Sequence, residues 1–82
     1  MPDLARSARY KELRKIFKEA RNAQRLRQKD VAQVIGRPQT YISAVETGVR
    51  RVDIIEFLRL TNALGLDPLD VLGRIIEIDD DP

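Results

Sequence analysis

The 82-residue sequence contains neither cysteine nor histidine. A disulfide framework, a metal site with thiolate or imidazole ligands, and catalysis by a Cys/His or Ser/His pair are therefore excluded. The remaining carboxylates show no recognisable catalytic spacing, and there is no glycine-rich loop of the kind that cradles phosphates. We therefore expect a protein that is not an enzyme and that uses no cofactor, metal ion or small-molecule ligand.

Long hydrophobic runs are also absent, since no unbroken apolar stretch exceeds three residues. This excludes a signal peptide and a membrane span, and it predicts a cytoplasmic protein with no membrane partner. A chain of this length forms one small domain, which buries roughly 60% of its unfolded surface. We assign that domain to residues 1–78, with 1–7 as a possible flexible arm, and expect residues 79–82 to be an acidic disordered tail.

The charge is distributed unevenly along the chain. Residues 1–37 hold eleven Lys and Arg against four acidic residues, a net charge of +7. Residues 38–51 have a net charge of +1, and residues 52–82 hold two basic against eight acidic residues, a net charge of −6. A basic front and an acidic back indicate a polyanionic partner, because neutralising phosphates releases condensed counterions. A charged face that is simply solvated is the alternative explanation.

Apolar residues recur at helical spacing in five segments of the chain. The first expected helix covers residues 8 to about 24, and the second covers Gln28 to Ile35. The third begins at Gln39 and ends at Gly48, a residue suited to a helix C-terminus. With no strand-like alternation and only short connections, these segments predict a compact all-α domain.

Two start signals define the last two expected helices. Asp53 begins an Asp-x-x-Glu capping box for the fourth helix, and Gly65 ends that helix. Asp67 followed by Pro68 caps a fifth helix that runs to about Ile76. On the fourth helix the spacing predicts a buried face made of Ile54, Phe57, Leu58, Thr61 and Leu64.

The stretch from Gln28 to Val45 reads as two short helices joined by a tight turn. Gly36 allows the first of them to stop, and Pro38 fixes φ at the start of the next without leaving an unsatisfied N–H. Val31, Ile35, Ile42 and Val45 point inward. On the helix that begins at Gln39, a polar stripe points outward and contains Gln39, Thr40, Ser43 and Thr47.

An ordered set of residues resembles a known family. The set follows Gln28 and begins with a small residue (Ala32), a turn glycine (Gly36) and two buried aliphatic residues (Ile42 and Val45). Two segments come after these residues: Glu46-Thr47-Gly48 and Ala63-Leu64-Gly65-Leu66-Asp67-Pro68. This pattern is similar to the phage-repressor and Cro-like, or Xre-type, DNA-binding regulators from about Leu13 to Leu72. The resemblance implies a five-helix lambda-repressor-like DNA-binding domain with a helix-turn-helix at helices 2 and 3.

The resemblance also assigns roles to residues. Helix 3 would enter the major groove of double-stranded DNA, and its base-reading residues would be Gln39, Thr40, Ser43 and Ala44. An amide at Gln39 suits adenine N6 and N7, and Ala44 is small enough for close approach. Phosphate contacts would come from Gln28, Lys29, Arg37, Tyr41, Arg50 and Arg51. Arg21 and Glu46 would form a structural ion pair.

Three residues depart from the family pattern, and all of them add positive charge. Arg25 stands where many relatives have a helix-ending glycine, Arg27 where they have a capping Thr or Ser, and Arg37 where an aliphatic residue is common. Because losing a cap typically costs about 1 kcal/mol, we expect the junction between the first two helices to be less tight.

The function implied is a sequence-specific transcriptional regulator, expected to be a repressor, that binds an inverted-repeat operator as a homodimer. A dimer interface is predicted at apolar residues of the fifth helix that exceed the needs of one core: Leu69, Val71, Leu72, Ile75, Ile76 and Ile78. A fully intramolecular core is the alternative for these residues. Two other functions remain open, an antitoxin-like or other module that binds a protein partner, and a controller regulator of a restriction-modification system.

Overall fold

Five α-helices make up the computed structural model, which describes residues 6–79. They are α1 (Ala8–Ala23), α2 (Gln28–Ile35), α3 (Gln39–Thr47), α4 (Ile54–Ala63) and α5 (Pro68–Ile76). The order and type of the elements agree with the sequence-based prediction. Ser7 caps α1, because its hydroxyl accepts a hydrogen bond from the Tyr10 N–H at 3.2 Å. Residues 1–5 of the predicted arm and residues 80–82 of the predicted tail lie outside the described residues.

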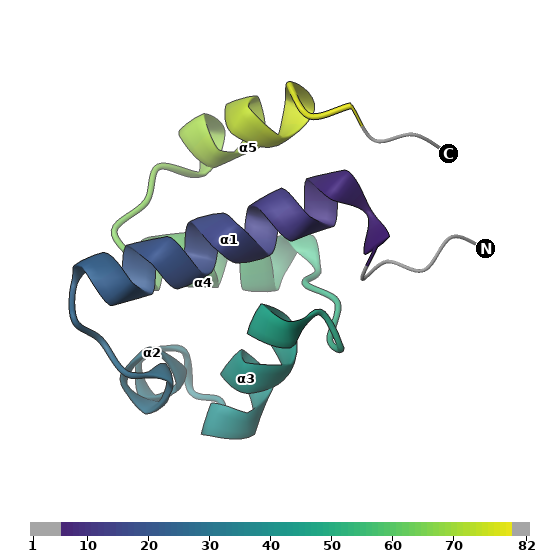
Figure 1. Cartoon of the computed structure of the whole chain (residues 1–82). Coiled ribbons are helices and arrows are strands. Elements are labelled where there is room, and N and C mark those ends of the chain that lie inside the picture. Colours follow the sequence, from purple (N-terminus) through teal and green to yellow (C-terminus); the bar gives the residue numbers. More distant parts are fainter. Residues whose placement is uncertain (1–5, 80–82) are drawn as a thin grey trace.

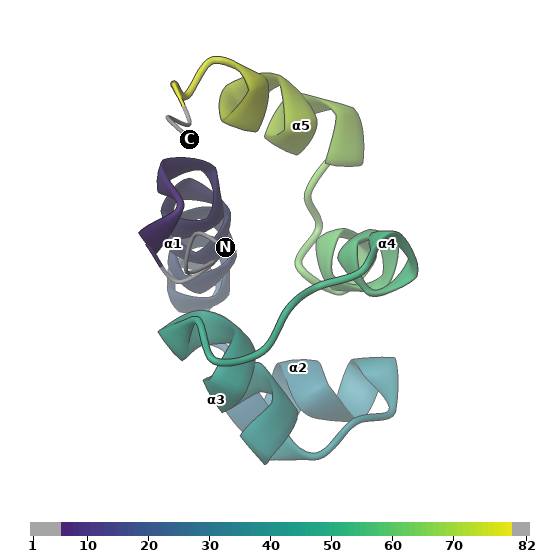
Figure 2. The same cartoon turned by 90° about the vertical axis from the view of Figure 1, so that its right-hand side faces the viewer.

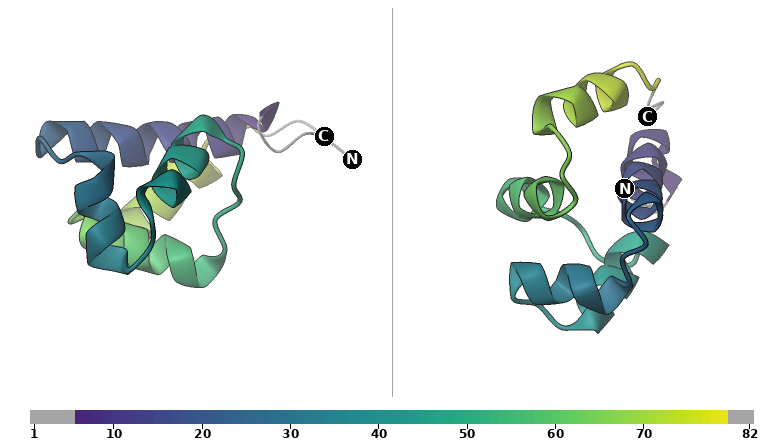
Figure 3. Two further views of the ribbon diagram at one scale, coloured as in Figure 1. Left: turned by 90° about the horizontal axis from the view of Figure 1, so that it is seen from below. Right: turned by 90° about the vertical axis from the view of Figure 1, so that its left-hand side faces the viewer.

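The helices are arranged around the long helix α1 (Figure 1). Helices α2 and α3 lie at one end of the molecule and α5 lies at the other, with α1 and α4 between them (Figure 2). Helix α2 packs against both α3 and α4, and α5 packs against α1 and α4. Seen from below, α3 lies in front of the other helices, and in the view from the opposite side it lies at the bottom of the molecule beside α2 (Figure 3). Within residues 6–79, no helix combines the length and apolar character that crossing a membrane would require.

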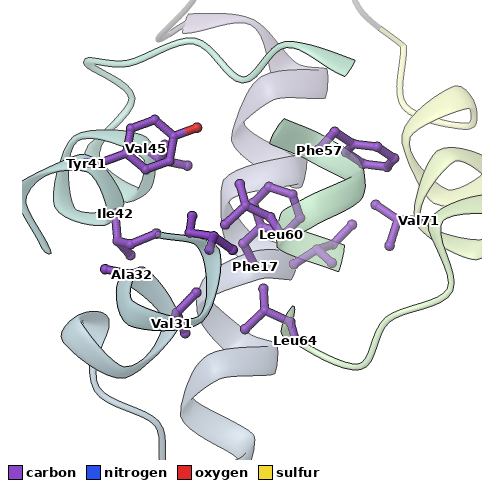
Figure 4. Close-up of a cluster of buried hydrophobic side chains, with 12 residues drawn as sticks. Phe17, Val31, Ala32, Tyr41, Ile42, Val45, Phe57, Leu60, Leu64 and Val71 are labelled. Atoms are coloured by element: carbon purple, nitrogen blue, oxygen red, sulfur yellow. The ribbon is translucent and has the colours of Figure 1, made fainter. Parts of the chain in front are cut away.

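The hydrophobic core receives side chains from all five helices (Figure 4). The rings of Phe17 and Phe57 meet in a tilted arrangement with centroids 6.2 Å apart. Burying each large aliphatic or aromatic side chain contributes about 1.5–3 kcal/mol, so these contacts hold the two ends of the molecule together. The buried apolar residues are Ile16, Phe17, Val31, Ala32, Ile35, Tyr41, Ile42, Val45, Phe57, Leu60, Leu64 and Val71.

The buried face of α4 differs from the prediction. Phe57, Thr61 and Leu64 are buried as expected, but Ile54 is 62% exposed and Leu58 is 45% exposed. Leu60 and Glu56 are buried in their place. The inward face is therefore rotated about the helix axis relative to the predicted one, because several apolar residues on α4 make more than one face compatible with helical spacing. An apolar surface is left on the outside of α4.

The junction between α1 and α2 contains two of the departures from the family pattern. Arg25 adopts a left-handed φ of +57°, and the Leu26 N–H donates to the Arg21 carbonyl at 3.0 Å. Helices commonly end on a left-handed residue, which is usually glycine. Here that residue is an arginine, and the left-handed conformation costs a residue with a side chain about 1–2 kcal/mol. At Arg27 the backbone N–H donates to Asp30 Oδ2 at 2.7 Å, so Asp30 supplies half of a capping box. Hydrogen bonding from Arg27 lowers the pKa of Asp30.

Candidate nucleic-acid interface

Helix α3 is held between two glycines in left-handed conformations, Gly36 with φ +70° and Gly48 with φ +86°. The Arg37 N–H donates to the Ala32 carbonyl at 2.9 Å and closes α2 immediately before the turn. Of the four predicted base-reading residues, Gln39 and Thr40 are exposed, whereas Ser43 and Ala44 are half-buried. The turn therefore places the first residues of α3 at the surface, while the middle of the helix is partly covered.

A chain of polar contacts connects the inside of the molecule to Gln39. The predicted pair of Arg21 and Glu46 is present, with Arg21 Nε donating to Glu46 Oε2 at 2.7 Å and Arg21 Nη2 donating to Glu46 Oε1 at 3.0 Å. Gln28 Nε2 donates to Glu46 Oε1 at 3.0 Å, and Gln39 Nε2 donates to Gln28 Oε1 at 2.8 Å. We call these four residues the polar relay. The two glutamine contacts were not predicted from the sequence.

The inner half of the polar relay is shielded from water. The Arg21 side chain is only 12% exposed to solvent and the Glu46 side chain only 6%. They border a small cavity whose other walls are apolar, and Arg21 Nη1 also donates to the Leu26 carbonyl at 2.9 Å. In such surroundings the two charges interact strongly and their separation is costly. The apolar walls are Phe17, Val31, Ile42, Val45, Leu60 and Leu64.

A second polar cluster joins the turn before α3 to α4. Arg37 Nη2 donates to Glu56 Oε1, and the Arg37 guanidinium carbon lies 5.2 Å from the centroid of the Tyr41 ring. The Arg50 guanidinium carbon lies 5.1 Å from the same centroid. Burial raises the pKa of Tyr41, and the charge of Glu56 adds to this effect. We call Arg37, Tyr41, Arg50 and Glu56 the Tyr41 cluster.

Two of the residues predicted to contact phosphate, Tyr41 and Arg37, lie within the Tyr41 cluster. Tyr41 is only 6% exposed and its hydroxyl is buried, so that hydroxyl does not reach a phosphate in this structure. Arg37 is engaged with Glu56. The predicted capping box of Asp53 and Glu56 is only half formed. The Glu56 N–H donates to Asp53 Oδ1 at 2.8 Å, whereas the Glu56 carboxylate pairs with Arg37. No local pattern could have revealed the pair of Arg37 and Glu56, since 19 positions separate the two residues.

The other predicted phosphate contacts are accessible. Lys29, Arg50 and Arg51 are exposed, and Gln28 is half-buried within the polar relay. Lys29 is the second residue of α2, and Arg50 and Arg51 follow the end of α3. Positive charge thus lies at the beginning of one motif helix and beyond the end of the other.

Two residues of the predicted dimer interface on α5 contribute to the core of the single chain instead. Val71 is 3% exposed and belongs to the core, and Ile75 is partly buried against it. Ile78 is half-buried, and the Arg9 guanidinium donates to its carbonyl at 3.0 Å. The remaining apolar residues stay exposed, together with those on the outer face of α4. We call this exposed set the α4–α5 patch: Ile54 62%, Ile55 57%, Leu58 45%, Leu69 76%, Leu72 37% and Ile76 68% exposed.

Comparison with known proteins gives consistent matches. A family model described as helix-turn-helix matches residues 17–71. A XRE-family like protein from Pseudomonas syringae pv. tomato is 39% identical, covers 84% of each chain, and superimposes with a TM-score of 0.79. The restriction-modification controller protein C.AhdI from Aeromonas hydrophila is 30% identical over 78% of this chain and 93% of its own, with a TM-score of 0.70.

One further solved structure shares the fold at lower identity. The restriction-modification controller protein C.Esp1396I, solved as a tetramer with its natural 35-base-pair operator, is 21% identical over 87% of this chain and 93% of its own, with a TM-score of 0.75. A search of curated protein sequences found no match.

Proposed function

The chain belongs to the XRE-type helix-turn-helix family of transcriptional regulators, and from this premise we propose that it represses transcription by binding an inverted-repeat operator as a homodimer. In this proposal α3 enters the major groove and α2 crosses the DNA backbone. The protein acts by binding alone, without catalysis. The observation that carries the proposal is the exposed amide of Gln39, held at the start of α3 by the polar relay.

Base reading is assigned to the first turn of α3. Gln39 can donate one hydrogen bond and accept another, which matches adenine N7 and N6. The Thr40 methyl can contact a thymine, and Ser43 and Ala44 border the approach of the helix to the bases. Backbone phosphates are assigned to exposed positive groups and to Gln28 at the N-terminus of α2, where free amides favour an anion. The positive groups are Lys29, Arg50 and Arg51.

Selection of bound fragments from random double-stranded DNA tests this assignment. We expect enrichment of one palindromic motif at physiological salt, with two half-sites about 34 Å apart. The half-sites should contain an adenine at the position that Gln39 reads. Failure to enrich any motif, with the protein shown to be folded, would contradict the proposed function and favour a protein-interaction module.

The proposal of a dimer follows from the size of the molecule and from its apolar surface. One chain extends 35 Å in its longest dimension and offers one reading helix of nine residues, so it covers one half-site. Exposed apolar patches rimmed by polar residues mark protein–protein contacts. We place the dimer contact at the α4–α5 patch. Helix α5 lies at the opposite end of the molecule from α3 (Figure 2).

Leu69→Asp is expected to convert the dimer into a monomer at micromolar concentration, because it places a charge in the apolar contact. Leu69 is 76% exposed in the single chain, so the fold should be unaffected. Sedimentation velocity measures the mass. Val34→Asp, at a position 69% exposed on α2 and outside the patch, is the matched control and should remain dimeric. A Leu69→Asp protein that still sediments as a dimer would place the contact elsewhere.

A controller regulator of a restriction-modification system is the second candidate. The 30% identity to C.AhdI over most of both chains favours it. The two candidates share the DNA-binding mechanism and differ in the genes that they regulate. A methyltransferase gene beside the coding sequence, with the selected motif in its promoter region, would distinguish this candidate from a repressor of unrelated genes.

A further inference from the structure

We propose that Glu56 sets the strength of sequence-independent DNA binding by keeping Arg37 away from the phosphate backbone. This inference rests on the proposed function, since it concerns how the same surface binds DNA. It makes Glu56 a positioning residue that acts through Arg37. Neither the family pattern nor the charge distribution along the sequence assigns such a role to an acidic residue of α4.

The position of Arg37 is the first observation. It lies in the turn between the two motif helices, two residues before Gln39, and the sequence predicts a phosphate contact for it. Its side chain turns instead toward α4 and forms an ion pair with Glu56. The ring of Tyr41 packs beneath the guanidinium and adds a cation–π contact.

The burial of Glu56 is the second observation. The Arg37 side chain is 40% exposed, but the Glu56 side chain is only 8% exposed. Its second carboxylate oxygen, Oε2, is buried and has no hydrogen-bond partner within residues 6–79. Arg37 is therefore the group that compensates this carboxylate, and a phosphate could recruit Arg37 only by leaving Glu56 as a buried, unpaired charge.

The magnitudes decide between the two partners of Arg37. Leaving the buried Glu56 carboxylate without its partner changes an equilibrium constant by up to about a thousandfold, and water around the 40% exposed Arg37 side chain reduces this figure. One phosphate contact, with a salt slope of about 0.9, strengthens binding by about fivefold at 0.15 M salt relative to 1 M. Arg37 consequently stays with Glu56 when DNA binds.

Arg50 provides the contrast within the same cluster. It packs on the same ring as Arg37, it is exposed, and within residues 6–79 no ion pair links it to an acidic residue. The Tyr41 cluster thus contains two arginines at one ring, but among the described residues only one of them, Arg50, is an unpaired cation that the DNA phosphate backbone can contact. Glu56 is responsible for this difference.

The test is the salt dependence of binding to a random-sequence duplex, measured for the full chain and its variants. For Arg50→Gln the slope of log K against log salt should become shallower by about 0.9, the value for one lost phosphate contact. For Arg37→Gln the slope should not change. For Glu56→Gln, which releases Arg37 while keeping the side-chain volume, the slope should steepen by about 0.9 and affinity at 0.15 M salt should rise about fivefold.

Two further variants test whether the loss of any nearby negative charge has the same effect and whether Glu56 acts through Arg37. Asp53→Asn removes a neighbouring negative charge while keeping an N-cap residue, and its slope should equal that of the wild type. The double variant Glu56→Gln with Arg37→Gln should return to the wild-type slope, because no released arginine remains. Circular dichroism on each variant confirms that the slopes compare folded proteins.

Two results would overturn the inference while leaving the proposed function standing. One is a slope for Arg37→Gln that becomes as shallow as that of Arg50→Gln, which would show that Arg37 contacts phosphate in the wild type. The other is a Glu56→Gln protein that is folded and binds with the wild-type slope. If the wild-type protein shows no salt-dependent binding to any duplex, both the proposed function and this inference are wrong.

Discussion

Arg21→Met is expected to lower the free energy of unfolding by about 3–5 kcal/mol, because it leaves the Glu46 carboxylate buried without its cationic partner. Glu46 is 6% exposed at the side chain, and the cavity beside it is otherwise apolar. A domain of this length has a total stability of only about 4–12 kcal/mol. The loss is therefore a large fraction of the total, and urea denaturation followed by circular dichroism should show an unfolding midpoint at a much lower urea concentration than for the wild type.

The double variant Arg21→Met with Glu46→Leu separates the loss of the pair from the cost of an orphaned charge. Replacing both partners of a buried ion pair by apolar residues is often neutral or stabilising, so the double variant should recover most of the lost stability. Its operator affinity should remain reduced, since Gln28 then lacks the carboxylate that orients it. A single variant as stable as the wild type would contradict a structural role for the pair.

Gln39→Ala is expected to weaken binding to the selected operator by about 10–100-fold, because a bidentate contact to a base is worth about 1–3 kcal/mol. Affinity for a random duplex should change less than twofold, since phosphate contacts carry no sequence information directly. The measurement is fluorescence anisotropy on both duplexes at the same salt concentration. Equal weakening on both duplexes would refute a base-reading role for Gln39.

The polar relay explains why the Gln39 amide is directed as it is. A carboxylate only accepts hydrogen bonds, so Glu46 requires the Gln28 amide to present its NH₂ group inward and its oxygen outward. That oxygen accepts one N–H of Gln39. The second N–H and the oxygen of Gln39 remain available, and together they match the acceptor and donor of adenine in the major groove.

Gln33→Ala is the matched control for Gln39→Ala. Gln33 is exposed on α2, and no hydrogen bond of its side chain to another residue is found within residues 6–79. The substitution removes the same amide from a position outside the proposed reading surface. Affinity for both the operator and the random duplex should therefore stay within twofold of the wild type.

The helices and the motif could be predicted because their signals are local. Gly36 and Pro38 interrupt the apolar pattern, and Asp53 and Asp67 cap helices that begin one residue later. Each of these signals acts over a few residues through backbone conformation and capping. The pairing of Arg21 with Glu46 was available only through the family resemblance, since 25 positions separate the two residues in the chain.

Contacts between elements could not be read in the same way. Helical spacing allowed Leu58 on the inner face of α4, and only packing against α2 and α5 selected Leu60 and Glu56 instead. Val71 was one apolar residue among several on α5, and the fold assigned it to the core. Side-chain direction around a helix axis depends on the neighbours that cover it, and those neighbours are distant in sequence.

The sequence by itself determined an all-α chain with a helix-turn-helix, no thiol or imidazole chemistry, and a basic half suited to a polyanion. Only the tertiary structure decided which positive charges of the chain are available. It placed Arg37 against a buried carboxylate of α4 and left Arg50 exposed at the same aromatic ring. The physical reason is that a formal charge is a property of one residue, whereas its availability to a ligand depends on burial and on the partner across the fold.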